Sequence, residues 1–230
     1  MSRADLGKEP EEVSAMFDGV ARRYDLLNDL LSLGRTKAWR KVATEVIAPK
    51  PGMRILDIAA GTGSSSRPLA DAGADVIPLD FSKGMLAAGR KRHPDLAFTQ
   101  GDALALAFKD NEFDVTTISF GLRNTSDTSK ALRESFRVLK SGGRMVVVEF
   151  SQPTNKIFRT IYLRYLMRAL PTVARKVSSN PDAYVYLAES ILAWPNQNGL
   201  AELMKVAGFG SVQWKNLTFG IVAIHTGVKP

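Results

Sequence analysis

The chain has 230 residues, of which 45% are hydrophobic, and a formal net charge of +8. This length suits one domain with a sizeable core, and the absence of cysteine excludes disulfides and thiolate chemistry. No run approaches the roughly 18 apolar residues that cross a bilayer, and the charged N-terminus shows no secretory signal. The excess of Lys and Arg suits nucleic acid, anionic lipid or acidic ligands, or simply a basic solvated surface.

The first part of the chain predicts a helical cap over residues 1–48. Apolar residues recur at helical spacing between Ser14 and Ile47, with a break around residues 32–34. Proline and glycine in residues 49–52 then end this segment.

Residues 49–150 alternate short apolar runs with helical segments and predict an α/β core. The expected strands are Arg54–Ile58, Asp75–Leu79, Leu96–Thr99, Asp114–Ser119 and Arg144–Phe150. The expected helices are Ser64–Ala72, Lys83–Arg92, a short piece near Ala105, and Thr128–Leu139. This alternation predicts right-handed βαβ units and a parallel sheet that is covered on both faces.

The C-terminal third departs from this rhythm. Residues 151–195 are helical and aromatic-rich, which we interpret as an inserted substrate cap. Residues 196–230 predict a last helix, Gly199–Ala207, and two closing strands, Ser211–Asn216 and Gly220–Thr226, which must run antiparallel because few residues join them. A mostly parallel seven-stranded sheet with an antiparallel C-terminal hairpin and a small helical cap resembles the Rossmann-like fold of class I methyltransferases.

A glycine turn follows the first predicted strand. Its backbone can approach a ligand closely, so we predict that Gly61, Thr62 and Gly63 line a cofactor. Ser66 stands where the dinucleotide fingerprint has its third glycine, which favours a smaller, zwitterionic group over a pyrophosphate. Asp57, at the end of the strand, suits a ligand that bears an ammonium and a sulfonium.

Polar residues also follow the next strands. Asp80 ends the second strand, where a carboxylate can accept both hydroxyls of a ribose, in NAD or in an adenosyl group; a helix N-cap is the structural alternative. Asp102 and Ala103 follow the third strand, where a carboxylate and a backbone N–H can meet an adenine. Ser119 ends the fourth. Because such sheets bind ligands at the carboxyl ends of their strands, these residues together predict an S-adenosylmethionine site.

Longer motifs carry a more specific resemblance. They are residues 16–25 (MFDGVARRYD) with 28–29 (ND), 80–82 (DFS) with 85–86 (ML), 120–124 (FGLRN), 184–187 (YVYL) with 189–191 (ESI), and 216–225 (NLTFGIVAIH). With them the chain resembles the menaquinone and ubiquinone C-methyltransferase family along nearly its whole length. One departure is Ser64, where the family often has an acidic residue, so the amino group of the donor is less surely paired.

The resemblance implies that S-adenosylmethionine methylates a ring carbon of a prenylated hydroquinone. A naphthoquinol is favoured because the chain resembles short bacterial members, while methylation of a benzoquinol stays open. The resemblance also points to Tyr24 as a substrate contact, with a core aromatic as the equally weighted alternative.

A ring carbon becomes a good nucleophile once the neighbouring hydroxyl, with a pKa near ~10 as in tyrosine, loses its proton. We expect Arg123, just beyond the fourth strand, to stabilise the phenolate, and Asn124 to hold a water that removes the proton. A structural ion pair is the alternative for Arg123.

Neither histidine is expected to act as a base. His93 lies in a polar turn, and we expect His225 on the closing strand about 17 Å below the rim, at ~3.3 Å per residue. Asn216 and Thr218, in the hairpin turn, are better placed. With two histidines, no cysteine and no clustered carboxylates, no metal site is expected.

One segment could touch a membrane. Its basic residues are Lys156, Arg159, Arg164 and Arg168, and its apolar residues are Ile157, Phe158, Ile161, Tyr162, Tyr165, Leu166 and Leu170. Such a basic amphipathic helix can lie on anionic lipid, and packing on the core with a solvated basic face is the alternative. We therefore expect a cytoplasmic protein, with peripheral contact to the inner face of the cell membrane and an open choice between monomer and homodimer.

Rival functions fit less well. A nucleic-acid methyltransferase is disfavoured because no Asn-Pro-Pro-Tyr-type motif follows the fourth strand and no catalytic cysteine is present, so no nucleic-acid partner is expected. A nicotinamide oxidoreductase is opposed by the missing third glycine and the antiparallel ending. A non-enzymatic binding module stays open, although Asp80 and Arg123 oppose it.

Overall fold

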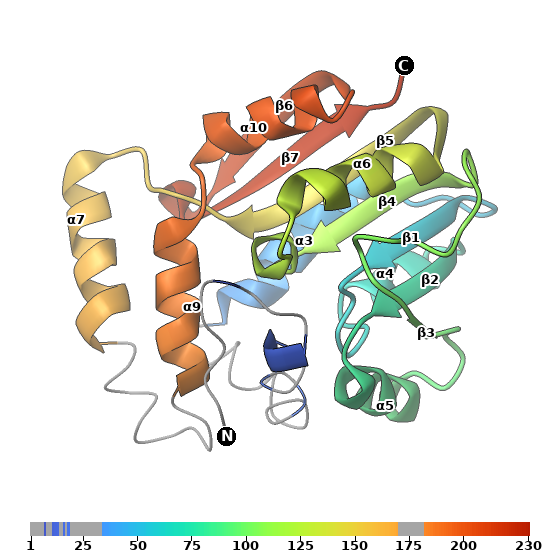
Figure 1. Cartoon of the computed structure of the whole chain (residues 1–230), viewed down its shortest axis with the longest axis horizontal. Coiled ribbons are helices and arrows are strands. Elements are labelled where there is room, and N and C mark those ends of the chain that lie inside the picture. Colours follow the sequence, from blue (N-terminus) through green and yellow to red (C-terminus); the bar gives the residue numbers. More distant parts are fainter. Residues whose placement is uncertain (1–6, 8–10, 14–15, 17, 19–33, 170–181) are drawn as a thin grey trace.

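A computed structural model describes residues 7, 11–13, 16, 18, 34–169 and 182–230. Its centre is a seven-stranded sheet with the order β3-β2-β1-β4-β5-β7-β6 (Figure 1). The strands are β1 (Arg54–Ile58), β2 (Asp75–Asp80), β3 (Thr99–Gln100), β4 (Phe113–Ser119), β5 (Leu139–Phe150), β6 (Gly210–Leu217) and β7 (Val222–Val228). Strands β1 to β5 pair in parallel, whereas β7 runs antiparallel to β5 and β6. The predicted sheet with its antiparallel ending is therefore confirmed.

Helices cover the sheet and extend beyond one end of it. They are α3 (Arg35–Ile47), α4 (Ser66–Asp71), α5 (Lys83–Arg92), α6 (Thr128–Val138), α7 (Lys156–Arg164), α9 (Asp182–Ala193) and α10 (Gln197–Val206). Short helical turns are η1 (Leu122–Asn124), the π-helical η2 (Tyr165–Ala169) and η3 (Thr218–Gly220). Within the described part of the chain, no helix has the length and apolar character that a membrane span needs.

The core has one layer on each face of the sheet. Successive strand residues point to opposite faces, so Ile55 of β1 packs with α3 and α4, whereas the next residue, Leu56, belongs to the cluster that includes α6 and α10. Helix α6 begins where the carboxylate of Asp127 accepts a hydrogen bond from the backbone N–H of Lys130, as an N-cap should.

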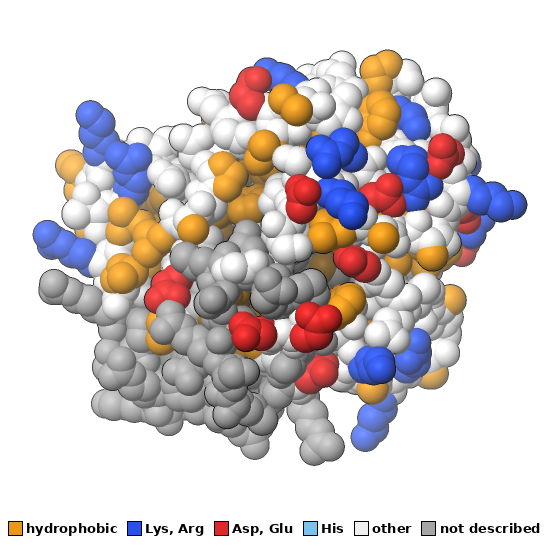
Figure 2. All heavy atoms as spheres, in the orientation of Figure 1, with side chains coloured by type: hydrophobic (Ala, Val, Ile, Leu, Met, Phe, Trp, Pro, Cys, Tyr) orange, Lys and Arg blue, Asp and Glu red, His pale blue; other side chains and the backbone are white. Residues whose placement is uncertain are grey.

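Helices α7 and α9 form a third, smaller apolar cluster (Figure 1). Tyr162 and Leu166 are buried against Ala188 and Ile191, and Phe150 at the end of β5 packs against the same cluster. The surface around α7 shows hydrophobic side chains next to Lys and Arg (Figure 2). The helical, aromatic-rich character predicted for residues 151–195 is thus found in the described part of that segment.

Three local predictions are corrected. The short helix near Ala105 is wrong, because a bridge between Asp102 and Ala105 closes a turn there. The third strand is two residues long and later than expected, since Leu96 and Phe98 pack with Leu86 of α5 outside the sheet. The fifth strand begins at Leu139, earlier than predicted. The division into four segments, with boundaries at residues 48, 150 and 195, stays a prediction.

Candidate cofactor and substrate site

The glycine turn after β1 is fixed by a carboxylate from β2. The backbone N–H of Gly61 donates to Oδ2 of Asp80 at 2.8 Å. Gly61 and Gly63 both have positive φ, 58° and 79°, which favours glycine. A Cβ at Gly63 would also lie 2.6 Å from the ring of Phe98. Gly61 therefore has open space where a Cβ would stand, whereas Gly63 needs glycine because it packs against Phe98.

Asp57 is a buried carboxylate, and only one of its two oxygens has a hydrogen-bond partner in the described part of the chain. Its Oδ2 accepts hydrogen bonds from the hydroxyls of Ser65 at 2.8 Å and Ser66 at 2.6 Å. Its Oδ1 is buried and has no hydrogen-bond partner among the described residues. Burial raises the pKa of Asp57 to about 6, although the two serine hydroxyls oppose the shift. A cationic group of a ligand would supply the missing partner, which fits the predicted ammonium site.

Asp80 is half-buried at the end of β2. Its Oδ1 accepts from the backbone N–H of Ser82 at 2.8 Å, and burial raises its pKa. The N-cap of α5 is Ser82, whose hydroxyl accepts from the N–H of Met85. The capping role considered for Asp80 therefore belongs to Ser82. Each oxygen of Asp80 has a second lone pair, which can accept a ligand hydroxyl.

The other predicted donor-site residues lie at the same edge. Asp80 pairs in register with Gln100, the residue before Gly101 and Asp102. Asp102 folds its turn by accepting from the N–H of Leu104 at 2.8 Å, and Ala103 lies within that turn. Ser119 ends β4, the strand that pairs with β1. The structure thus brings the carboxyl ends of β1 to β4 together, as predicted.

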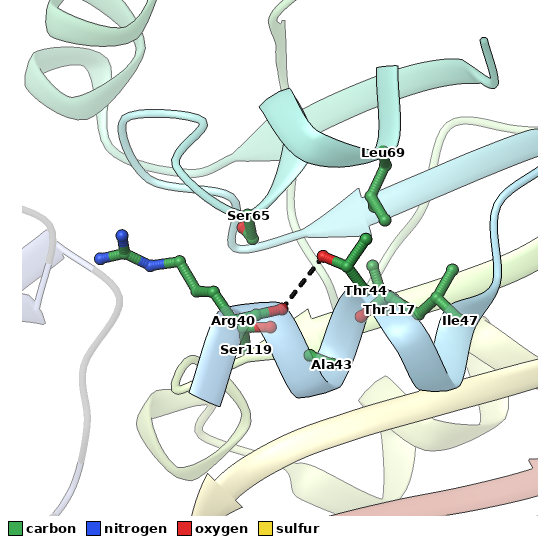
Figure 3. Close-up of a pocket in the computed structure, with 8 residues that line it drawn as sticks. All are labelled: Arg40, Ala43, Thr44, Ile47, Ser65, Leu69, Thr117 and Ser119. Carbon is green, nitrogen blue, oxygen red and sulfur yellow. Dashed lines mark hydrogen bonds between the residues drawn. The ribbon is translucent and has the colours of Figure 1, made fainter. Parts of the chain in front are cut away.

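Helix α3 lines a hollow next to this edge. The sequence analysis did not predict this hollow. It is lined by Arg40, Ala43, Thr44, Ile47, Ser65, Leu69, Thr117 and Ser119 (Figure 3). Ser65, which donates to Asp57, links the hollow to the glycine turn. The Oγ1 atom of Thr117 is buried and has no partner in the described residues. Hydroxyl groups therefore face the hollow from the sheet and from the turn.

Arg123 is buried in an ion pair. Its Nη1 donates to Oε1 of Glu149 at 2.9 Å and also to the carbonyl of Phe120, while its backbone N–H donates to Oε2 of Glu149 at 3.3 Å. Its guanidinium carbon lies 5.1 Å from the ring centre of Phe150. The ion-pair alternative considered for Arg123 is thus present. Glu149 was not predicted as the partner of Arg123, because 26 residues separate the two and no local pattern links them.

Asn124 connects η1 to helix α9. Its side-chain oxygen accepts from the hydroxyl of Tyr186 at 3.3 Å. Tyr186 is buried and packs with Met16 from the N-terminal region. Tyr24, the other predicted substrate residue, lies outside the described residues, as does Leu170.

Three aromatic rings form a wall next to Arg123. The ring centre of Trp39 lies 5.8 Å from that of Phe120 and 6.3 Å from that of Phe150, and the two phenylalanines are 5.1 Å apart. Trp39 is buried and its indole N–H donates to the hydroxyl of Thr218 at 2.8 Å. We call Trp39, Phe120 and Phe150 the aromatic wall. The rings are tilted by 44° to 84° to one another, and only Phe120 and Phe150 are partly exposed, at the β5 side of the edge.

Gly121, the residue after Phe120 of the aromatic wall, lies against Ala59, which precedes the glycine turn. Gly121 follows Phe120, and a Cβ at Gly121 would lie 2.4 Å from the Cβ of Ala59. Ala59 itself has a positive φ of 54°. The chain therefore needs glycine at 121 to accept the methyl group at 59.

The position predicted for His225 is wrong. His225 pairs with Val147, and Ser119 pairs with Val148, so His225 is one residue below the level of Ser119 in the sheet register. Gly220 lies in η3, above the start of β7, so its separation from His225 along the chain does not give the depth of His225 below Ser119.

A structural role for His225 stays a prediction, which its surroundings support. It is buried, its Nε2 lies 2.8 Å from the carbonyl of Gln197, and burial lowers its pKa. The side chain of Gln197 also donates to Asn216 at 2.8 Å and to the carbonyl of Gln152 at 3.0 Å. Asn216 is therefore tied to the packing of α10.

Comparisons with known proteins agree with this geometry. The chain matches the model of the ubiE/COQ5 methyltransferase family over residues 5–229. It is 60% identical over 229 residues to the demethylmenaquinone methyltransferase of Streptomyces avermitilis, covering 100% of this chain and 99% of the relative. It is 57% identical over 230 residues to that of Mycobacterium marinum, with 100% and 99% covered.

Solved structures share the fold at low identity. The [4+2]-cyclase SpnF gives a TM-score of 0.71 at 18% identity, covering 100% of this chain and 98% of that one. Phosphoethanolamine N-methyltransferase 2 of Haemonchus contortus, solved with S-adenosyl-L-methionine, gives 0.63 at 18% identity, covering 83% and 52%. The class I methyltransferase fold is confirmed. Together with the full-length family match, this means that the chain belongs to the ubiE/COQ5 methyltransferase family and is an S-adenosylmethionine-dependent methyltransferase.

Proposed function

We propose that this enzyme methylates a ring carbon of demethylmenaquinol and so produces menaquinol. The observation that carries the proposal is the 60% identity over the whole chain with an enzyme named demethylmenaquinone methyltransferase. The arrangement of the site supports it, because polar groups suited to the donor lie beside an aromatic wall suited to a quinol ring.

The residues at the ends of β1 to β3 fit the donor. The unpartnered Oδ1 of Asp57 would hold the ammonium group, and the second lone pairs of Asp80 would accept the ribose hydroxyls. Asp102 and Ala103 would meet the adenine. The turn at Gly61, Thr62 and Gly63 would pass close to the methionine part, with open space at Gly61 and with Ser119 at the rim. When bound, S-adenosylmethionine supplies an electrophilic methyl group.

Arg123 and the aromatic wall would act on the acceptor. The quinol ring would pack against the partly exposed Phe120 and Phe150 of the wall, with its reactive carbon in line with the methyl group, because orientation supplies much of the rate in such transfers. Arg123 stays protonated, so it would stabilise a phenolate and would not remove the proton. Its bonds to Glu149 and Phe120 both use Nη1, which leaves its other N–H groups for the acceptor. Asn124 would hold the water that takes the hydroxyl proton. As the new C–CH3 bond forms, the S–CH3 bond of the donor breaks and leaves S-adenosylhomocysteine. The ring carbon then loses its own hydrogen as a proton and the phenolate oxygen regains one, so that the transfer releases one proton overall.

The acceptor also bears on where the enzyme works. A prenyl chain partitions into lipid, since each buried CH₂ contributes about 0.8 kcal/mol. We therefore place the reaction at the inner face of the cell membrane, with the protein in peripheral contact and without a nucleic-acid partner.

A transfer assay tests the proposal. The purified chain is incubated with methyl-labelled donor and demethylmenaquinol, and the lipid extract is analysed by mass spectrometry. We expect one labelled methyl group on the naphthoquinol ring, and strongly reduced transfer by the Asp80→Asn variant. A lipid fraction that gains no label, although the donor binds, would contradict the proposed acceptor.

A further inference from the structure

Helix α7 has two apolar faces, and only one of them is packed. Tyr162 and Leu166 are buried in the cluster with α9. Ile157 and Ile161, one turn apart on another side of the helix, are 75% and 58% exposed. A helix that merely covers the core would keep polar residues on its outer side, so the exposed isoleucines need a separate explanation.

A second segment extends this exposed surface. Phe219, in the η3 turn between β6 and β7, is 77% exposed, and its ring centre lies 5.4 Å from that of Phe158 in α7. Phe219 also adopts a left-handed backbone conformation, with φ 58° and ψ 22°. We call Ile157, Ile161 and Phe219 the α7–η3 patch.

Positive charge surrounds the patch. Lys156 and Arg164 are exposed, Arg159 is partly exposed, and α7 contains no acidic residue. In Figure 2 the Lys and Arg side chains over α6 alternate with acidic ones, whereas those around α7 lie beside hydrophobic side chains. Apolar side chains with a basic rim match the surface of an anionic bilayer, where headgroups attract Lys and Arg and the acyl region accepts the apolar groups.

The patch is connected to the aromatic wall through packed apolar side chains. Phe158 of α7 touches Phe219, and Tyr162, one turn further along, belongs to the cluster that includes Phe150. Phe150 in turn stands beside Phe120 and Arg123. The route from the exposed patch to the predicted acceptor position is therefore apolar along its length.

We infer that the α7–η3 patch docks the enzyme on an anionic lipid bilayer, with the acceptor side of its active site facing the lipid. The inference rests on the proposed function, because a prenylated acceptor is what makes this placement useful. The sequence predicted a single basic amphipathic helix here. The structure divides its apolar residues between the α9 contact and the outer surface.

Variants can remove the patch without weakening the fold. Gln has a helix propensity at least equal to that of Ile, so Ile157→Gln and Ile161→Gln suit exposed helical positions. Asn tolerates the left-handed conformation better than Phe, so Phe219→Asn should relieve strain in the turn. Val206→Gln, at a site that is 79% exposed at the end of α10, is the matched control. Thermal unfolding of every variant verifies that the fold is kept.

Flotation with lipid vesicles measures docking. We expect the enzyme to float with vesicles of mixed phosphatidylcholine and phosphatidylglycerol, and to dissociate at high salt. The triple patch variant should bind roughly tenfold more weakly, Lys156→Gln and Arg164→Gln about fivefold each, and Val206→Gln should bind like the wild type. The inference is overturned if the wild-type protein does not float with anionic vesicles, or if the triple variant floats as well as the wild type. A triple variant that floats normally but loses a dimer would assign the patch to self-association.

Activity separates this inference from the proposed function. The triple variant should methylate a short-chain, water-soluble demethylmenaquinol at the wild-type rate, but lose turnover when the acceptor is embedded in vesicles. Equal rates on the embedded acceptor contradict the docking role. If the wild type methylates neither acceptor, the proposed function fails, while the flotation result still decides the role of the patch.

Discussion

The two halves of the carboxyl edge differ in chemistry. At the ends of β1 to β3, carboxylates are held by hydrogen bonds from backbone N–H groups and serine hydroxyls, as in Asp57 and Asp80. At the ends of β4 and β5, the Phe150 ring of the aromatic wall lies over Arg123, which forms a buried ion pair with Glu149. We refer to these as the donor half and the acceptor half.

This difference matches the two reactants that the proposed function requires. The donor is zwitterionic and needs hydrogen-bond acceptors, so the donor half keeps lone pairs available. The acceptor is a hydrophobic ring that develops charge only at its hydroxyl, so the acceptor half needs apolar surface and one well-placed cation. The halves meet where Gly121 touches Ala59. Substitutions in one half should therefore leave the function of the other intact, except at that contact.

The largest effect is expected at the ion pair. Glu149→Ala leaves the guanidinium of Arg123 buried without its partner, which should cost about 3–5 kcal/mol of unfolding free energy, measured by urea denaturation. The double variant Arg123→Met with Glu149→Leu should recover most of that stability but not methyl transfer. A double variant with full activity would show that the pair serves only the fold.

Asp80→Asn should damage the donor half alone. Hydrogen bonds to a charged acceptor contribute about 1.5–3 kcal/mol, so affinity for S-adenosylmethionine should fall roughly 10- to 100-fold by calorimetry. The exposed Asp75, at the start of β2, gives a matched control in Asp75→Asn, which should bind normally. If Asp80→Asn binds S-adenosylmethionine with unchanged affinity, Asp80 does not bind the ribose hydroxyls.

The contact between the halves can be broken and repaired. Gly121→Ala places two methyl groups too close together and should destabilise the fold by about 1–3 kcal/mol, as overpacking does. It should also impair both donor binding and turnover. Adding Ala59→Gly removes the opposing methyl group and suits the positive φ at that residue. If the double variant behaves like Gly121→Ala alone, this contact does not couple the halves.

The smallest expected effect is a pH dependence at Asp57. Because its folded-state pKa, about 6, lies above the unfolded value, the unliganded protein should lose stability as pH rises from about 4 to about 6. The ionised form is the one that pairs with an ammonium group. Donor affinity should therefore rise about tenfold between about pH 5 and neutrality. Calorimetry on Asp57→Asn should show weaker binding without this rise, and the same slope in that variant would assign it elsewhere.

Local patterns made much of the donor half predictable from sequence. The strand Arg54–Ile58 and the helix Lys83–Arg92 appear with the predicted bounds. The reason is that short apolar runs and helix signals act over a few residues. The placement of Asp57 and Asp80 followed directly, because strand ends fix the edge.

The acceptor half was harder to predict because its contacts are distant in sequence. Arg123 meets Glu149 across 26 residues, and Trp39 meets Thr218 across 179. Helical or strand periodicity in the sequence does not indicate contacts between residues so far apart. The predicted depth of His225 in the sheet was wrong for a related reason. That depth is set by the register with the neighbouring strand β5, which the number of residues along β7 does not reveal.

A crystal structure with bound donor tests the central claim most directly. We predict the ammonium group at Oδ1 of Asp57, the ribose hydroxyls on Asp80, and the methyl group directed toward the aromatic wall. Donor bound away from Asp57 and Asp80, or a methyl group directed away from Phe120 and Phe150, would contradict the division of the edge into a donor half and an acceptor half.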